Sequence, residues 1–216
     1  MSWTAPENTI LRSFMDVPDA PRVVHAVSVG SPQKVHYTYD LDHGMLVQLW
    51  RGDFLNTTPM WHNRGNGTSR PVGMVQALGK PVLTIAQLSS VQQTWVTDSV
   101  QAAYRPKGYV LDNEDLPVFR YQIYGTTVKD AIRVLEEGHG IHRVLEVEQP
   151  VSNLYARLAE GKSIEAVSDG LYLIDDKAYY VQMDNAANVQ PVIRDGERGK
   201  ELIVPIQTQL SYSILF

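Results

Sequence analysis

The chain has 216 residues, of which 44% are hydrophobic and 20% are charged, and its net charge at pH 7 is −5. This length and composition are ordinary for a globular protein that buries a sizeable core. The acidic balance argues against a general nucleic-acid binder, and the lack of cysteine excludes disulfides, zinc–thiolate sites, thiol nucleophiles and covalent haem within this chain.

Short strands separated by turns are predicted along the whole chain, and this pattern favours an all-β fold with little helix. A helical turn or two is expected only at 151–158. We expect a single large antiparallel sandwich domain over 1–216, of the super-sandwich kind, with the loop 104–117 as the one candidate internal boundary. The predicted strands are 23–29, 35–39, 45–50, 82–87, 100–104, 119–124, 128–137, 143–147, 170–174, 178–183, 202–206 and 210–215.

The segment WRGDF at 50–54 is the first candidate site. On a strand, the aromatic Trp50 faces one side while Arg51 and Asp53 face the other. A functional interpretation is a sugar-like or carboxylate ligand held by the guanidinium of Arg51, with the Trp50 face for stacking. The alternative is a core tryptophan behind a solvent-facing ion pair between Arg51 and Asp53.

A second candidate site follows in MWHNRGNG at 60–67, which is too rich in glycine and asparagine for a regular strand. We expect a loop at the end of a sheet, where Trp61, His62 and Arg64 would contact a ligand. His62 has no neighbouring carboxylate in the sequence to orient it as a general base. The structural alternative is a loop anchored by Trp61, with Arg64 hydrogen bonded to exposed carbonyls.

Two histidines and two glutamates lie within EEGHGIH at 136–142. His139 and His142 are weak candidates for metal ligands, because their spacing does not match the i, i+4 pair that zinc proteases carry on a helix. A hairpin turn with exposed side chains is the simpler interpretation, and we expect no metal and no cofactor.

Several longer segments together suggest a family. In order, the chain contains ILRSFM (10–15), AVSVG (26–30), VHYTYD (35–40), LVQLWRGDFLNTTPMWHNRG (46–65), FRYQIYG (119–125) and ELIVPIQTQLSYSILF (201–216). This series resembles a poorly characterised β domain of exported bacterial proteins, found beside c-type cytochrome and quinoprotein sugar-dehydrogenase-like domains. The resemblance implies an exported accessory module near redox or carbohydrate chemistry. Since the chain has no CxxCH sequence and no propeller, it cannot itself carry covalent haem.

We therefore expect a non-catalytic binding or assembly module of a periplasmic oxidoreductase or of a carbohydrate-processing system. Its partner would be a protein of a periplasmic complex or a carbohydrate ligand, with no nucleic acid and no membrane span, because no apolar run approaches ~18–20 residues. The location would be periplasmic or secreted. The start of the chain lacks the pattern of a signal peptide, so either the protein is cytoplasmic or such a peptide has already been removed, and the resemblance favours removal.

The alternative is a carbohydrate-active enzyme, namely an epimerase, a lyase or a hydrolase. His62 with Asp40 or Asp53 would then supply acid–base chemistry. Arg51 or Arg64 would stabilise the negative charge that develops on the substrate.

Overall fold

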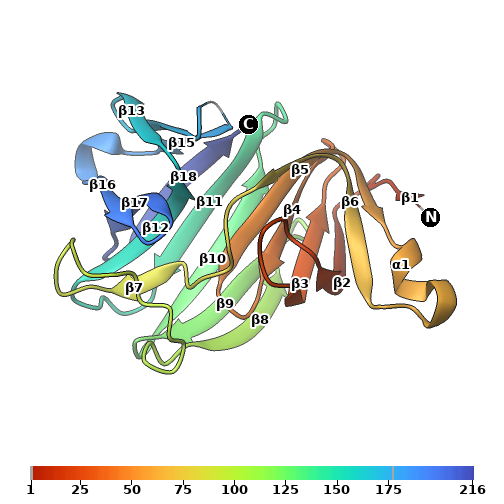
Figure 1. The fold of residues 1–216 in the computed structure, drawn as a ribbon, viewed down its shortest axis with the longest axis horizontal. Helices are drawn as coiled ribbons and strands as arrows, with labels where there is room; N and C mark the ends of the chain where they lie inside the picture. The colour runs from red at the N-terminus through yellow and green to blue at the C-terminus, as the bar shows by residue number, and fades with distance from the viewer. Residues whose placement is uncertain (1, 177) are drawn as a thin grey trace.

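A computed structural model describes residues 2–176 and 178–216 of the chain (Figure 1). Strands account for 56% of the residues and helices for 5%, which confirms the all-β prediction. Within these described residues the strands form three sheets, of six, eight and four strands. The described helices have only three or four residues each, and none has the length or the apolar character to cross a membrane.

The N-terminal strands close into a small barrel, which the single-sandwich prediction did not include. Neighbouring strands from β2 to β6 pair antiparallel, and β6 then pairs parallel with β2 through Phe14 and Met15. This last pairing removes both free edges. The barrel sheet consists of β1 (Ser2–Trp3), β2 (Thr9–Met15), β3 (Val23–Gly30), β4 (Val35–Asp40), β5 (Met45–Asn56) and β6 (Thr68–Ala77), with α1 (Thr58–Trp61) and η1 (His62–Arg64) between the last two strands.

Strand β4 is buried on both of its faces because it belongs to two cores. His36 points into the barrel, where its ring packs 5.4 Å from Trp50 and 5.3 Å from Phe54. Tyr39, on the opposite face, stacks on Phe119 of the eight-stranded sheet with ring centroids 3.8 Å apart. The alternation of side chains along one strand therefore fills the barrel and also attaches it to the rest of the molecule.

The eight-stranded sheet forms the platform of the fold. Burial alternates along β9, β10 and β11, so one face of the sheet is packed and the other faces solvent. The chain returns at its end to place β18 between β15 and β11. The sheet consists of β8 (Arg105–Leu111), β9 (Pro117–Ile123), β10 (Thr126–Val134), β11 (Gly140–Val147), β13 (Ile164–Ser168), β14 (Leu171–Ile174), β15 (Tyr179–Met183) and β18 (Gln209–Leu215).

The four-stranded sheet and the barrel both contribute to the core that covers the platform. This shared core includes Tyr39 from the barrel, Phe119 from the platform and Leu202 from the four-stranded sheet. In Figure 1 the barrel lies to the right and the four-stranded sheet to the left. The four-stranded sheet consists of β7 (Ile85–Gln87), β12 (Leu154–Gly161), β16 (Val192–Gly196) and β17 (Gly199–Pro205), and η2 (Ala186–Asn188) precedes β16.

Three predicted segments differ from the structure. The predicted helical turns at 151–158 are wrong, because this stretch enters β12, whose backbone hydrogen bonds go to β7 and β17. The predicted strand at 100–104 is a turn instead. The predicted loop at 104–117 contains β8, which forms a hairpin with β9.

A buried ion pair joins the barrel to the platform. Arg143 on β11 donates to Asp130 on β10, from Nε at 2.9 Å and from Nη2 at 2.6 Å, and the two side chains are 4% and 0% exposed. Tyr39 of the barrel donates to the same carboxylate at 2.8 Å. Burial alone would lower the pKa of Arg143, but Asp130 holds that pKa well above its ordinary value. Both charges are thus retained inside the fold.

The turn between β4 and β5 is held against this pair. The Gly44 carbonyl accepts hydrogen bonds from Arg143 at 3.1 Å and from the Thr84 hydroxyl at 2.6 Å. Gly44 has a φ of +60°, and a Cβ atom there would lie 2.7 Å from the ring of Tyr121. Only glycine accommodates both the backbone angle and the close approach. The ion pair therefore fixes the position of the residues beside Gly44.

We expect the Arg143→Met variant to lose roughly 3–5 kcal/mol of unfolding free energy, because Asp130 would remain buried without its partner. Urea denaturation followed by fluorescence and circular dichroism measures this loss. Lys200→Met is the matched control, since it removes the exposed Lys200–Asp195 pair. A similar small change in both variants would contradict the role given to the buried pair.

His36 makes the stability depend on pH. Its Nδ1 accepts from the Ser31 amide at 3.0 Å and its Nε2 bonds the Gly52 carbonyl at 2.9 Å, so the buried ring is neutral. Burial lowers the pKa of His36. Below pH ~6.5 the imidazole of His36 is protonated in the unfolded chain but still neutral in the folded state. The free energy of unfolding therefore decreases as the pH falls, until the pH reaches the pKa of His36 in the folded state.

His36→Gln should therefore show a shallower loss of unfolding free energy than the parent protein when the pH falls from about 8 to about 5. Urea denaturation at a series of pH values measures both slopes. His139→Gln, at an exposed histidine, is the control. Equal slopes in the parent protein and His36→Gln would refute the assignment to His36.

Candidate functional site

Trp50 lies inside the barrel rather than on a ligand-accessible surface. Its side chain is fully buried, and its Nε1 donates to the carbonyls of Asp53 at 3.0 Å and of Phe54 at 2.9 Å. The indole has no exposed face on which a ligand could stack. In place of ligand binding, Trp50 holds the bend of β5 and fills the barrel core.

Arg51 connects the barrel to the far end of the platform. Its Nη1 donates to the Gly138 carbonyl at 2.6 Å, its Nη2 bonds the Phe216 carbonyl, and its guanidinium lies 4.8 Å from the centre of the Phe216 ring. These contacts occupy the group that was predicted to bind a ligand or to pair with Asp53. Arg51 therefore has an architectural role in this structure.

Trp61, His62 and Arg64 lie on the exposed segment formed by α1 and η1, as the loop prediction expected. Trp61 is 79% exposed, the highest value for any aromatic side chain among the described residues. Neither Asp40 nor Asp53 forms a hydrogen bond with His62 in the described part of the chain. The structure does not assemble the predicted His62–aspartate catalytic set.

The two predicted metal ligands belong to separate ion pairs. His142 bonds Asp184 at 2.6 Å, whereas His139 lies 3.2 Å from Glu137 on the surface. Within residues 2–176 and 178–216 no group of three or more histidine, aspartate or glutamate side chains is arranged to hold a metal ion.

A cleft of about 290 Å³ lies where the barrel meets the four-stranded sheet. It combines side chains from the β4–β5 turn, the β6–β7 connection, the segment before β8, β12 and the β16–β17 hairpin. We refer to it as the charged cleft. Its exposed rim carries Lys80, Thr97, Glu197 and Arg198, and His43 lies at its barrel side. Its largely buried floor carries Trp95, Arg157, Glu160 and Glu201.

The charges of the floor come from three adjacent strands. Glu201 on β17 is the cross-strand partner of Arg194 on β16 and of Glu160 on β12. A bulge between Arg157 and Ala159 adds one residue to β12. Because the bulge changes the alternation, Arg157 and Glu160 bond each other although they are three residues apart in a strand.

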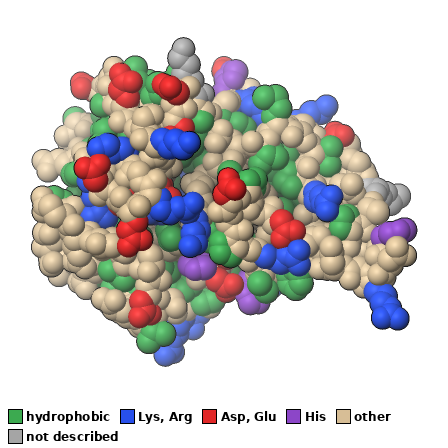
Figure 2. Space-filling model, viewed as in Figure 1, with side chains coloured by type: hydrophobic (Ala, Val, Ile, Leu, Met, Phe, Trp, Pro, Cys, Tyr) green, Lys and Arg blue, Asp and Glu red, His purple; other side chains and the backbone are tan. Residues whose placement is uncertain are grey.

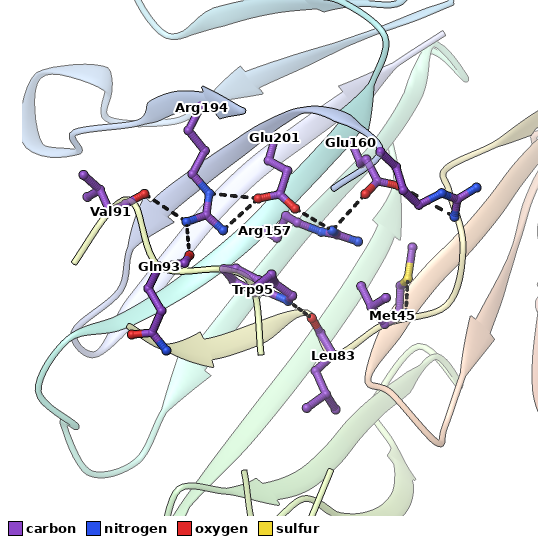
Figure 3. Close-up of polar contacts among 11 residues, drawn as sticks. Met45, Leu83, Val91, Gln93, Trp95, Arg157, Glu160, Arg194 and Glu201 are labelled. Atoms are coloured by element: carbon purple, nitrogen blue, oxygen red, sulfur yellow. Dashed lines mark hydrogen bonds and ion pairs between the residues drawn. The ribbon is translucent and has the colours of Figure 1, made fainter. Parts of the chain in front are cut away.

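Arginines offset the repulsion between the two carboxylates. Arg157 donates from Nη1 to Glu160 at 3.1 Å and to Glu201 at 2.9 Å, and Figure 3 shows it between the two. Arg194 bonds the other side of Glu201 at 2.8 Å and donates to the carbonyls of Val91 and Gln93. The floor is therefore a satisfied, rigid network of charges.

Trp95 completes this network. Its Nε1 donates to the Leu83 carbonyl at 2.8 Å, and the guanidiniums of Arg157 and Arg194 both lie 5.9 Å from the indole ring. The ring is 5% exposed, so it stacks on protein cations rather than on a ligand. Its role is to fix the two arginines and the segment that carries Thr97.

His43 is held at the cleft by a buried carboxylate. Its Nδ1 lies 2.6 Å from Oδ2 of Asp40, and the two side chains are 34% and 2% exposed. The second carboxylate oxygen, Oδ1, accepts from the Asp42 amide at 2.9 Å. Both oxygens of Asp40 are thus engaged, and the aspartate fixes the orientation of the imidazole.

The sequence pattern predicted that Asp40 would act with His62, whereas in the structure Asp40 bonds His43. The short spacing Asp-x-x-His in the turn at Asp40–His43 is the signal that would have identified the partner. No comparable signal links Arg157 and Glu160 to Glu201, because a bulge and a strand pairing bring them together. The floor of the cleft could be recognised only from the fold.

No family model matches the chain, and no curated protein matches it. The resemblance to the exported β domain therefore stays a prediction. The residues of the charged cleft are interpreted from their own geometry.

Proposed function

We propose that this protein is a binding module that holds a small polyhydroxylated molecule, such as a monosaccharide or a sugar acid, in the charged cleft. The observation that carries the proposal is the set of charged and polar side chains around a space of about 290 Å³. This volume lies near the lower end of the ~300–1,000 Å³ typical of ligand pockets, so it suits a small occupant.

The chemistry of the lining supports a hydroxyl-rich ligand. Lys80 and Arg198 supply donors at the rim, while Glu197 and Thr97 supply acceptors. Sugar hydroxyls both donate and accept, so they satisfy groups of both kinds. An apolar occupant would desolvate the same charges without replacing their hydrogen bonds.

The charges that line the cleft favour a ligand that is an acid. Lys80 forms no ion pair or hydrogen bond within the described residues, whereas Arg157 and Arg194 together offset the charges of Glu160 and Glu201. A carboxylate on the ligand would give Lys80 a partner. Acidic and basic side chains are interspersed over the face seen in Figure 2, so the preference for an acid is local to the cleft. As part of the same proposal, the protein is periplasmic or secreted and works beside proteins of redox or carbohydrate chemistry.

Lys80→Ala should weaken the binding of sugar acids such as D-glucuronate and D-galacturonate by about 10-fold, the order of one charge-assisted hydrogen bond. The affinity for the matching neutral sugars should change less. Ligand-observed NMR and calorimetry measure both affinities. Lys129→Ala removes a lysine that pairs with Glu148 on the platform, and it serves as the control. Unchanged affinities in Lys80→Ala would exclude the cleft as the binding site.

Assembly with a protein partner is a second candidate function, favoured by the exposure of Trp61. An apolar groove of about 310 Å³ on the barrel includes Phe14, Val24 and Met60. Arg12 lines the same groove, and Arg70 on β6 is exposed. Residues 1–108 carry 9 basic and 7 acidic side chains, a charge of +2. These features fit a partner segment that combines apolar and acidic side chains.

For this second candidate, Trp61→Ala should remove roughly 1–3 kcal/mol of binding free energy toward an acidic peptide that carries leucine and phenylalanine. NMR titration of the labelled protein measures the affinity and maps the contact. Met74→Ala is the control, because Met74 is also 79% exposed and lies on the same barrel. Peptide shifts confined to residues away from Phe14, Met60 and Trp61 would argue against this surface.

A further inference from the structure

We infer that His43 is a general base that abstracts the proton next to the carboxylate of a sugar acid held in the charged cleft, with Asp40 as its positioning residue. This inference rests on the proposed function, because it needs the acid to bind beside Lys80. It adds proton transfer to a site that was otherwise assigned to binding alone.

The protonation pattern of the imidazole follows from its partner. The carboxylate of Asp40 can only accept, so the Nδ1 atom 2.6 Å away must carry the hydrogen. In the neutral imidazole, Nε2 is then the free acceptor of a ring that lines the cleft. Within the described residues, Nε2 has no hydrogen-bond partner, and it is available to a substrate proton.

A buried aspartate also favours the protonated product of the reaction. Once Nε2 takes a proton, the imidazolium lies beside a carboxylate that is only 2% exposed. The negative charge of Asp40 stabilises this cation, as the aspartate of a catalytic triad does. The same carboxylate is fixed by the Asp42 amide, so it need not reorganise during the transfer.

Hydrogen bonds hold the backbone around the base. The His43 carbonyl accepts from the Thr84 amide at 3.3 Å, and the following residue, Gly44, accepts from the Thr84 hydroxyl and from Arg143. These bonds connect the base to Thr84, directly before β7, and to the buried ion pair. A base held on such a support keeps its direction when substrate binds.

Two cations that line the cleft with His43 complete the arrangement. The C–H bond breaks as its proton moves to Nε2, and the electron pair passes into the carboxylate, which becomes an enediolate. Lys80 and Arg198 would offset the added negative charge. The proton then returns to the same carbon, or the electron pair forms a double bond and expels the hydroxyl group of the next carbon, which takes the proton from Nε2 and leaves as water, so that an unsaturated acid is formed. Neither course needs a further reactant.

Deuterium uptake tests this step directly. The protein is incubated in D2O with D-glucuronate, D-galacturonate or D-mannuronate, and proton NMR follows the signal of the hydrogen next to the carboxylate. We expect at least one of these acids to lose the signal, and His43→Asn to slow the loss by at least about 100-fold while the acid still binds. His142→Asn is the matched control, because His142 forms a histidine–aspartate pair of the same 2.6 Å length outside the cleft.

The outcomes separate the two proposals. Binding without deuterium uptake, or equal uptake in His43→Asn, would overturn the catalytic inference and leave the binding module intact. Failure of all three acids to bind would overturn the catalytic inference, and failure of the matching neutral sugars as well would overturn both.

The nitrogen-15 spectrum of the imidazoles provides a test without substrate. We expect the Nδ1-protonated form at His43 and a mixture of forms in the Asp40→Asn variant. An Nε2-protonated His43 in the parent protein would overturn the inference.

Discussion

The ion pair between Arg143 and Asp130 is the interaction on which the rest of the arrangement depends. Two opposite charges on adjacent strands of the platform are removed from water, and such a pair is tolerated only if its remaining hydrogen-bonding positions are filled. The barrel fills two of them, through the hydroxyl of Tyr39 and the carbonyl of Gly44. The requirement to satisfy a buried charge therefore sets the position of the barrel on the platform, and an apolar contact alone would not specify that position as tightly.

The charged cleft is a consequence of this placement. Its barrel side is the turn that carries Gly44, and its floor belongs to the four-stranded sheet, so the distance between the two depends on where the barrel is attached. A bulge in β12 brings Arg157 beside Glu160, and strand pairing adds Glu201. Because the charges of the floor are already paired, the side chains of the rim, among them the unpaired Lys80, and the free nitrogen of His43 are left for a ligand. The site thus combines a rigid polar floor with a few groups that bind or react.

Local patterns made part of the fold predictable. Alternating β-branched and aromatic residues identified β3 and β4, and the Asp-Asp turn identified the hairpin of β14 and β15. Strand β6 was missed because Pro71 and Gly73 interrupt its pattern, although its pairing with β2 is what closes the barrel. The sequence also could not distinguish Trp50, which is buried, from Trp61, which is exposed, because both are followed by glycine- and arginine-containing segments. Residues of the cleft floor are far apart in the chain and meet only through sheet pairing.

The central claim is that the charged cleft binds a small acidic polyol, and a crystal structure of the protein with D-glucuronate tests it most directly. We predict electron density for the sugar acid between Lys80 and His43, with its carboxylate within hydrogen-bonding distance of the Lys80 ammonium group. Density for the acid elsewhere on the molecule, for example along the exposed Trp61 segment, with the cleft occupied only by water, would contradict the account.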